Sequence, residues 1–74
     1  MSTFDVEYTD TFGGEANYAW VRRATITAPE NASDSLLIRR AKWAIGISGR
    51  HRVESWGETI AVRPYGTCTI LFIT

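Results

Sequence analysis

Residues 69–73 read TILFI, a short segment with apolar side chains at both odd and even positions. Successive side chains of a β-strand point to opposite faces of its sheet, so a strand of this composition must be covered on both faces. A strand with that requirement belongs in the middle of a sheet. The segment therefore predicts the central strand, around which the rest of the chain has to be arranged.

Two further strands are predicted ahead of this segment, within residues 50–68. A tight turn centred on 56–57 would pair Val53 with Ile60, and a second turn, PYG at 64–66, would lead into the central strand. The two turns agree on a single hydrophobic face for this meander, which supports the register. The face would carry Val53, Ile60, Val62, Cys68 and Ile70.

The N-terminal part of the chain predicts a second hairpin. Residues 4–10, FDVEYTD, alternate apolar and polar side chains, as a half-buried strand does. Residues 17–27, NYAWVRRATIT, are rich in aromatic and β-branched residues and predict a longer strand. Pairing Tyr8 with Tyr18 would match the apolar side of the first strand to the aromatic side of the second. Trp20 would then belong to the core.

The one predicted helix lies within residues 28–49. Asn31 or Ser33 can cap its N-terminus, and Gly46 or Gly49 can end it in the left-handed conformation. Its apolar face, at spacings of three and four, would carry Leu37, Ile38, Ala41, Ala44 and Ile45. The order β-β-α-β-β-β predicts an α+β fold over residues 1–74, a single domain with one helix packed on a five-stranded, mainly antiparallel sheet.

Composition restricts the function classes. The formal net charge is zero, so overall charge does not draw the chain to nucleic acid or to an anionic membrane. There is no signal-peptide pattern, and the apolar run at 70–73 is far too short to span a bilayer. One cysteine excludes an internal disulfide. These features predict a soluble, cytoplasmic protein with no membrane partner.

No catalytic motif is present, so we expect no enzyme activity, no metal site and no cofactor. The single histidine, His51, and the single cysteine, Cys68, could form a pair near Val62. The alternative is that Cys68 is a small core residue and His51 a residue at the end of a strand.

The arginines suggest a phosphate-binding surface. Seven of the eight basic residues are arginine. Arg50, Arg52 and Arg63 are predicted on the meander face opposite Val53, with Arg50 opposite Arg63, and Trp56 stands nearby. Paired like charges need an acidic partner, either Glu54 or an external ligand. Arginines beside an exposed aromatic are typical of nucleic-acid or nucleotide binding, and an ordinary charged sheet face is the alternative.

The segment TFGGEA, residues 11–16, predicts a protruding hairpin loop, longer than two strands need to connect. We predict a partner-binding surface formed by Asp10, Phe12, Glu15 and Arg23, with Trp56 as a further contact. Phe12 would either fold back onto the sheet as a lid or insert into a partner as an anchor.

The helix offers a second apolar stripe, formed by Leu36, Trp43 and Ile47. Tryptophan is enriched at the centres of protein interfaces, so this stripe is a candidate homodimer or partner surface. The alternative is that a small domain buries both stripes of its helix.

Residues 8–23, YTDTFGGEANYAWVRR, together with residues 63–74, RPYGTCTILFIT, resemble a group of short proteins encoded by bacteriophages and prophages. The resemblance implies a phage accessory protein that acts in the bacterial cytoplasm. It further implies a non-enzymatic binder that inhibits a host defence complex, as anti-CRISPR proteins do. The alternatives are a nucleic-acid or nucleotide-binding module and a protein of virion assembly.

Overall fold

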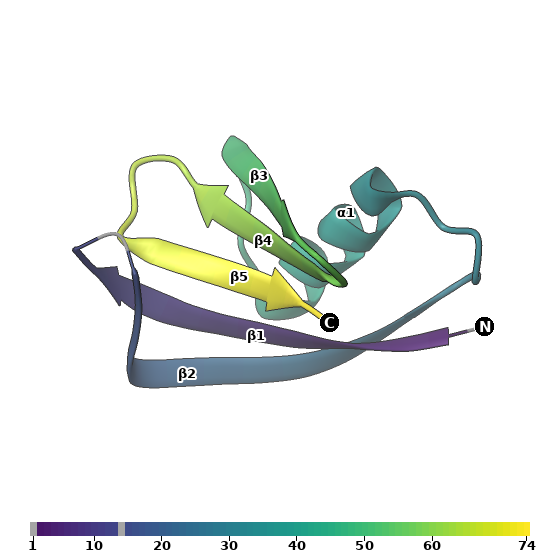
Figure 1. The fold of residues 1–74 in the computed structure, drawn as a ribbon, viewed down its shortest axis with the longest axis horizontal. Helices are drawn as coiled ribbons and strands as arrows, with labels where there is room; N and C mark the ends of the chain where they lie inside the picture. The colour runs from purple at the N-terminus through teal and green to yellow at the C-terminus, as the bar shows by residue number, and fades with distance from the viewer. Residues whose placement is uncertain (1, 14) are drawn as a thin grey trace.

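A computed structural model describes residues 2–13 and 15–74 and confirms the predicted α+β architecture (Figure 1). One helix packs on a five-stranded antiparallel sheet with the strand order β2-β1-β5-β4-β3. The elements are β1 (Ser2–Phe12), β2 (Glu15–Ala28), α1 (Asp34–Ile45), β3 (His51–Trp56), β4 (Thr59–Pro64) and β5 (Thr69–Ile73).

The TILFI segment forms β5, and it is the central strand, as predicted. It pairs with β1 on one side and with β4 on the other. Ile70, Leu71 and Ile73 are buried, although consecutive residues point to opposite faces. The strand therefore joins the β1–β2 hairpin to the β3–β4 hairpin. Its side chains need cover on both faces of the sheet.

The helix is bounded by capping interactions that the sequence indicated. The Ser33 side chain accepts a hydrogen bond from the Leu36 amide, and Gly46 ends the helix in the left-handed conformation, at φ 91°. Four of the five predicted face residues are buried, namely Leu37, Ile38, Ala41 and Ile45. Ala44 is exposed, so this part of the prediction is wrong.

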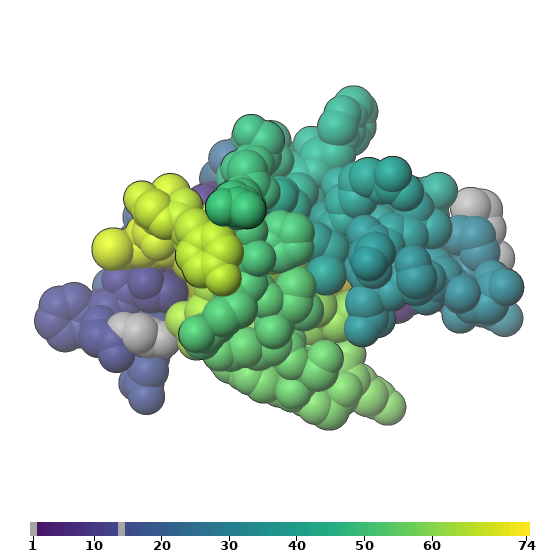
Figure 2. All heavy atoms as spheres, turned by 90° about the horizontal axis from the view of Figure 1, so that it is seen from above, coloured from purple at the N-terminus to yellow at the C-terminus, as the bar shows by residue number. Residues whose placement is uncertain are grey.

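The helix lies against one face of the sheet, and the other face we call the open face. The core between helix and sheet contains Val6, Tyr8, Ile26, Ala28, Leu37, Ile38, Ala41, Ile45, Val62, Leu71 and Ile73. The cross-strand register places Glu7, Arg23, Ala61 and Phe72 on the opposite side, in one row across the sheet. Figures 1 and 2 show the end of the β1–β2 hairpin projecting away from the helix.

The registers of the meander differ from those predicted. Val53 pairs with Val62 instead of Ile60, a shift of two residues that leaves every side chain on its predicted face. Val62 pairs with Leu71 instead of Cys68, a shift of three residues, which exchanges the two faces of β5. The prediction that Ile70 and Cys68 share a face with Val62 is therefore wrong, and Cys68 is exposed.

The register of the first hairpin also differs from the prediction, and the reason is an irregularity in the β1–β2 ladder between Thr9 and Thr11. Tyr8 pairs with Arg22, four residues beyond the predicted partner. Thr11 pairs with Ala16 and Phe12 with Glu15, so four residues of the predicted TFGGEA loop belong to the strands and the prediction of a long loop is wrong. Gly14 lies outside the described residues. Residues 17–20 of β2 stand opposite Asp10 alone, four residues against one, so β2 forms a bulge here with three more residues than a regular ladder would pair.

Side-chain hydrogen bonds hold this bulge in place. The Asp10 carboxylate accepts from the Asn17 amide group and from the Ala19 backbone N–H, both at 2.9 Å. The first of these bonds is the main reason that the pKa of Asp10 lies below its ordinary value. The Thr9 hydroxyl donates to the Trp20 carbonyl at 2.8 Å.

The bulge sends two aromatic side chains in different directions. Tyr18 has a φ of 57°, which is uncommon for a residue other than glycine, and its side chain reaches Glu7 on the open face. Trp20 contacts the Tyr8 ring at a centroid distance of 5.4 Å, on the helix face. Trp20 remains 42% exposed, so its prediction as a core residue is wrong.

We expect Leu71→Ala to lower the free energy of unfolding by about 2–5 kcal/mol, because it creates a cavity in the central strand. Val53→Ala is the matched control, since Val53 is 41% exposed, and it should cost less than about 1 kcal/mol. Urea denaturation measures both values. Equal losses would show that β5 is not the centre of the core.

We expect Asp10→Ala to release the bulge without unfolding the sheet. The Ala19 amide proton should exchange roughly tenfold faster, because it loses a hydrogen bond to a carboxylate. Hydrogen exchange followed by NMR measures the rate, and Asp5→Ala, at an exposed position on the same strand, is the control. An unchanged Ala19 rate in Asp10→Ala would show that the bulge does not depend on this carboxylate.

Candidate binding site

The open face of the sheet is hollowed, and the hollow has a volume of about 830 Å³. Its lining comes from all five strands, and two of its residues, Arg23 and Trp56, are among those predicted to contact a partner. The side chains that define its chemistry are Asp5, Glu7, Tyr18, Arg23, Trp56 and Phe72.

One wall of the hollow is aromatic. The rings of Trp56 and Phe72 lie 5.6 Å apart between centroids, tilted by 51°. Trp56 belongs to β3 and Phe72 to β5, so the contact passes over β4, where Ala61 presents only a methyl group. Ala61 is fully buried although it lies on the open face, which is consistent with cover by these rings.

The opposite wall is polar and centres on Glu7. Glu7 and Arg23 are directly opposite each other on neighbouring strands, and the Arg23 Nε atom donates to the Glu7 carboxylate at 3.3 Å. The Tyr18 hydroxyl also bonds to this carboxylate, and that bond is the main reason that the pKa of Tyr18 is raised. The bulge thus completes the wall, because it alone brings Tyr18 to Glu7.

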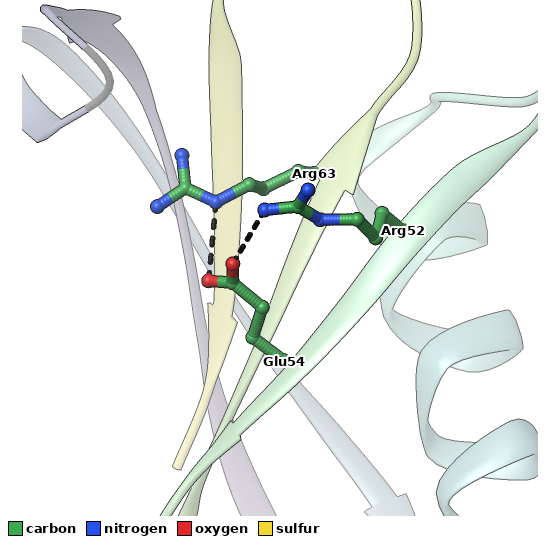
Figure 3. Close-up of polar contacts among 3 residues, drawn as sticks. All are labelled: Arg52, Glu54 and Arg63. Carbon is green, nitrogen blue, oxygen red and sulfur yellow. Dashed lines mark hydrogen bonds and ion pairs between the residues drawn. The ribbon is translucent and has the colours of Figure 1, made fainter.

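A second charged cluster lies on the open face at the β3–β4 side (Figure 3). The Glu54 carboxylate accepts from Arg52 at 2.7 Å through one oxygen and from Arg63 at 3.2 Å through the other. These two bonds, that of Arg52 first, lower the pKa of Glu54. The acidic partner of the opposed arginines is therefore Glu54, within the chain.

The arginine pairing itself differs from the prediction. Arg52, not Arg50, lies opposite Arg63. Arg50 precedes β3 and is exposed, and its carbonyl accepts a hydrogen bond from the Tyr65 amide. Since Glu54 already engages both guanidinium groups, less positive charge is left on this face for a phosphate.

The residues predicted around the hairpin loop do not form one surface. Phe12 and Glu15 are exposed at the hairpin end, whereas Arg23 lies in the hollow. Asp10 binds the bulge and acts on the site only by positioning Tyr18. Phe12 is 80% exposed, so its prediction as a lid folded onto the sheet is wrong.

The second apolar stripe predicted on the helix, Leu36, Trp43 and Ile47, does not form one exposed surface. Trp43 is 86% exposed, but Leu36 is half-buried and Ile47 packs against the core. Trp43 instead borders a hollow of about 430 Å³ between α1 and β3. Beside this hollow the Lys42 Nζ atom lies 3.2 Å from the His51 Nδ1 atom, and it donates to the Gly49 carbonyl.

Four residues of the site were missed by sequence reasoning, namely Asp5, Glu7, Tyr18 and Phe72. The opposite charges of Glu7 and Arg23 were a usable signal, because the correct register makes them cross-strand partners. Phe72 was predicted only as part of an apolar strand. For Tyr18 there was no signal, since regular pairing places it on the helix face beside Tyr8.

Comparison of the chain with protein-family models, curated proteins and solved structures finds no match. Within residues 2–13 and 15–74, no group of three or more histidine, cysteine or acidic side chains could hold a metal ion. No helix in the described part of the chain is long and apolar enough to cross a membrane.

We expect the Glu54 carboxylate to titrate below its ordinary pKa of 4.5. A lowered folded-state pKa stabilises the protein above the unfolded value, and this contribution is lost as pH falls through the folded-state value. Arg52→Met should raise the pKa of Glu54 toward 4.5, because the bond from Arg52 is the largest cause of the shift.

Carboxyl ¹³C chemical shifts followed from pH 7 to pH 2 by NMR measure this titration. Arg50→Met is the control, because Arg50 forms no ion pair among the described residues and should leave the Glu54 titration unchanged. A Glu54 pKa that is the same in Arg52→Met and in the parent protein would contradict the hydrogen bond from Arg52 to the Glu54 carboxylate.

Proposed function

We propose that this chain is a small non-enzymatic protein that acts by docking a partner protein on the open face of its sheet. The observation that carries the proposal is that Trp56, 49% exposed, lies in the hollow of the open face against Phe72 and not in the core. A 74-residue domain has a thin core and gains stability from any apolar side chain that it buries. Tryptophans left at the surface of such a domain are favoured as anchors for a partner.

The open face is the favoured docking surface because its aromatic residues lie inside a hollow. Anchor residues of protein interfaces typically sit in pockets surrounded by polar groups, where a partner can exclude water. Trp56 and Phe72 lie beside Glu7 and Arg23 in this arrangement. Phe12, exposed at the hairpin end, is a separate candidate contact.

The resemblance to short phage and prophage proteins favours a bacterial host protein as the partner, in the cytoplasm. We propose a defence complex within that class as the first partner to test. A nucleic-acid-binding function of Arg50, Arg52 and Arg63 is less favoured, because Glu54 engages two of the three guanidinium groups.

Partner capture from bacterial lysate tests the proposal. The immobilised protein should retain a partner protein, and Trp56→Ala should reduce the amount retained at least about tenfold, as the loss of a central aromatic anchor does. Trp43→Ala is the matched control, since it removes the most exposed tryptophan from the helix and leaves the open face intact. Amide NMR spectra establish that each variant is folded.

Nuclease treatment separates the two function classes. Retention of a protein should be unaffected by nuclease and should persist in moderate salt. Recovery of nucleic acid alone, lost steeply as salt rises, would contradict the proposal and support the arginine and Trp56 module. Loss of capture in Trp43→Ala but not in Trp56→Ala would move the docking surface to the helix.

A further inference from the structure

We infer that the hollow on the open face binds a basic side chain, an arginine or a lysine, that projects from the partner protein. The inference rests on the proposed function, because it names the chemistry that the partner presents at the docking surface. It is carried by the combination of an aromatic wall with carboxylates in one hollow.

The aromatic wall supplies ring faces for a cation. A guanidinium or ammonium group is attracted to the face of tryptophan more strongly than to the faces of other aromatic rings. Trp56 is half exposed and lines the hollow, and its tilted contact with Phe72 restricts its orientation. Tyr18, on the other side of the hollow, is exposed and adds a third ring to the lining.

The charges of the hollow complement a cation. Asp5 and Glu7 lie two positions apart on β1, so both point to the open face. The Asp5 carboxylate forms no ion pair among the described residues. Arg23 is the single basic residue in the lining, against these two carboxylates. A phosphate or a carboxylate entering the hollow would meet the unpaired charge of Asp5.

The polar wall is built to accept a further donor. Glu7 already receives Arg23, but that pair is separated by 3.3 Å, and the Arg23 side chain is 68% exposed. Exposed pairs of this kind contribute little free energy, so the Arg23–Glu7 pair opposes a second donor only weakly. An incoming guanidinium can therefore share the Glu7 carboxylate, while Trp56 and Phe72 cover its apolar stem.

Titration with short peptides tests this inference on the intact protein. The probe is acetyl-Gly-Arg-Gly-amide, and the matched control replaces arginine with citrulline, which keeps the shape and removes the charge. We expect the arginine peptide to shift the Trp56 indole signal and the amide signals of Asp5, Glu7 and Phe72 in NMR spectra. The citrulline peptide should bind at least roughly fivefold more weakly.

Two variants make the test specific. Trp56→Ala and Asp5→Asn should each weaken binding of the arginine peptide several-fold, whereas Trp43→Ala should leave it unchanged. Equal binding of the citrulline peptide, the strongest shifts at Trp43, or no saturable shift with either the arginine peptide or its lysine counterpart would each overturn the inference. Tighter binding of acetyl-Gly-Glu-Gly-amide in the hollow would do the same.

The two proposals can fail separately. If partner capture requires Trp56 but the arginine and lysine peptides do not bind, the docking surface stands and the basic side chain is wrong. If the arginine peptide binds in the hollow as expected but partner capture is unaffected by Trp56→Ala, the basic-side-chain chemistry stands and the proposed docking surface is wrong.

Discussion

The structure depends on the need to cover both faces of β5. Leu71 and Ile73 point toward the helix, and the helix buries them. Ile70 and Phe72 point to the open face, where there is no helix, so cover has to come from the sheet itself. Ile70 lies beside Thr9, and Phe72 receives the Trp56 ring across β4. The same constraint that makes β5 central therefore also creates the aromatic wall of the candidate site.

A second constraint comes from the unequal lengths of β1 and β2. Four residues of β2 stand opposite Asp10, and a regular ladder pairs only one residue of β2 with it. The carboxylate of Asp10 accepts hydrogen bonds from this segment, which satisfies backbone and side-chain donors that the ladder leaves unpaired. As a result Tyr18 reaches Glu7 on the open face while Trp20 packs against Tyr8 on the helix face. Asp10 therefore shapes the candidate site without lining it.

The charges of the open face are balanced locally. Glu7 pairs with Arg23 on the β1–β2 side, and Glu54 joins Arg52 and Arg63 on the β3–β4 side. The sequence separates an acidic N-terminal segment from a basic remainder, but the antiparallel pairing brings acids and bases together. Asp5 is the acid of the hollow that gains no ion pair among the described residues, which gives the hollow its excess negative charge.

The sequence by itself determined the elements, their order and some of their faces, but not the faces of β5. The alternation of residues 4–10, the Ser33 and Gly46 caps and the two-sided TILFI strand are local patterns, and each predicted its element correctly. A predicted face was still correct where the predicted register was wrong by an even number of residues, as for Val53 and Val62. The reason is that side chains alternate between the two faces with a period of two.

Only the tertiary structure decided the registers and the candidate site. The bulge at 17–20 depends on a carboxylate from another strand, and the Trp56–Phe72 contact depends on two strands that are not neighbours. No pattern within a single segment contains such information, because each contact is set by how separate strands align. The sequence therefore determined which residues could bind, and the alignment of the strands decided which of them meet in one hollow.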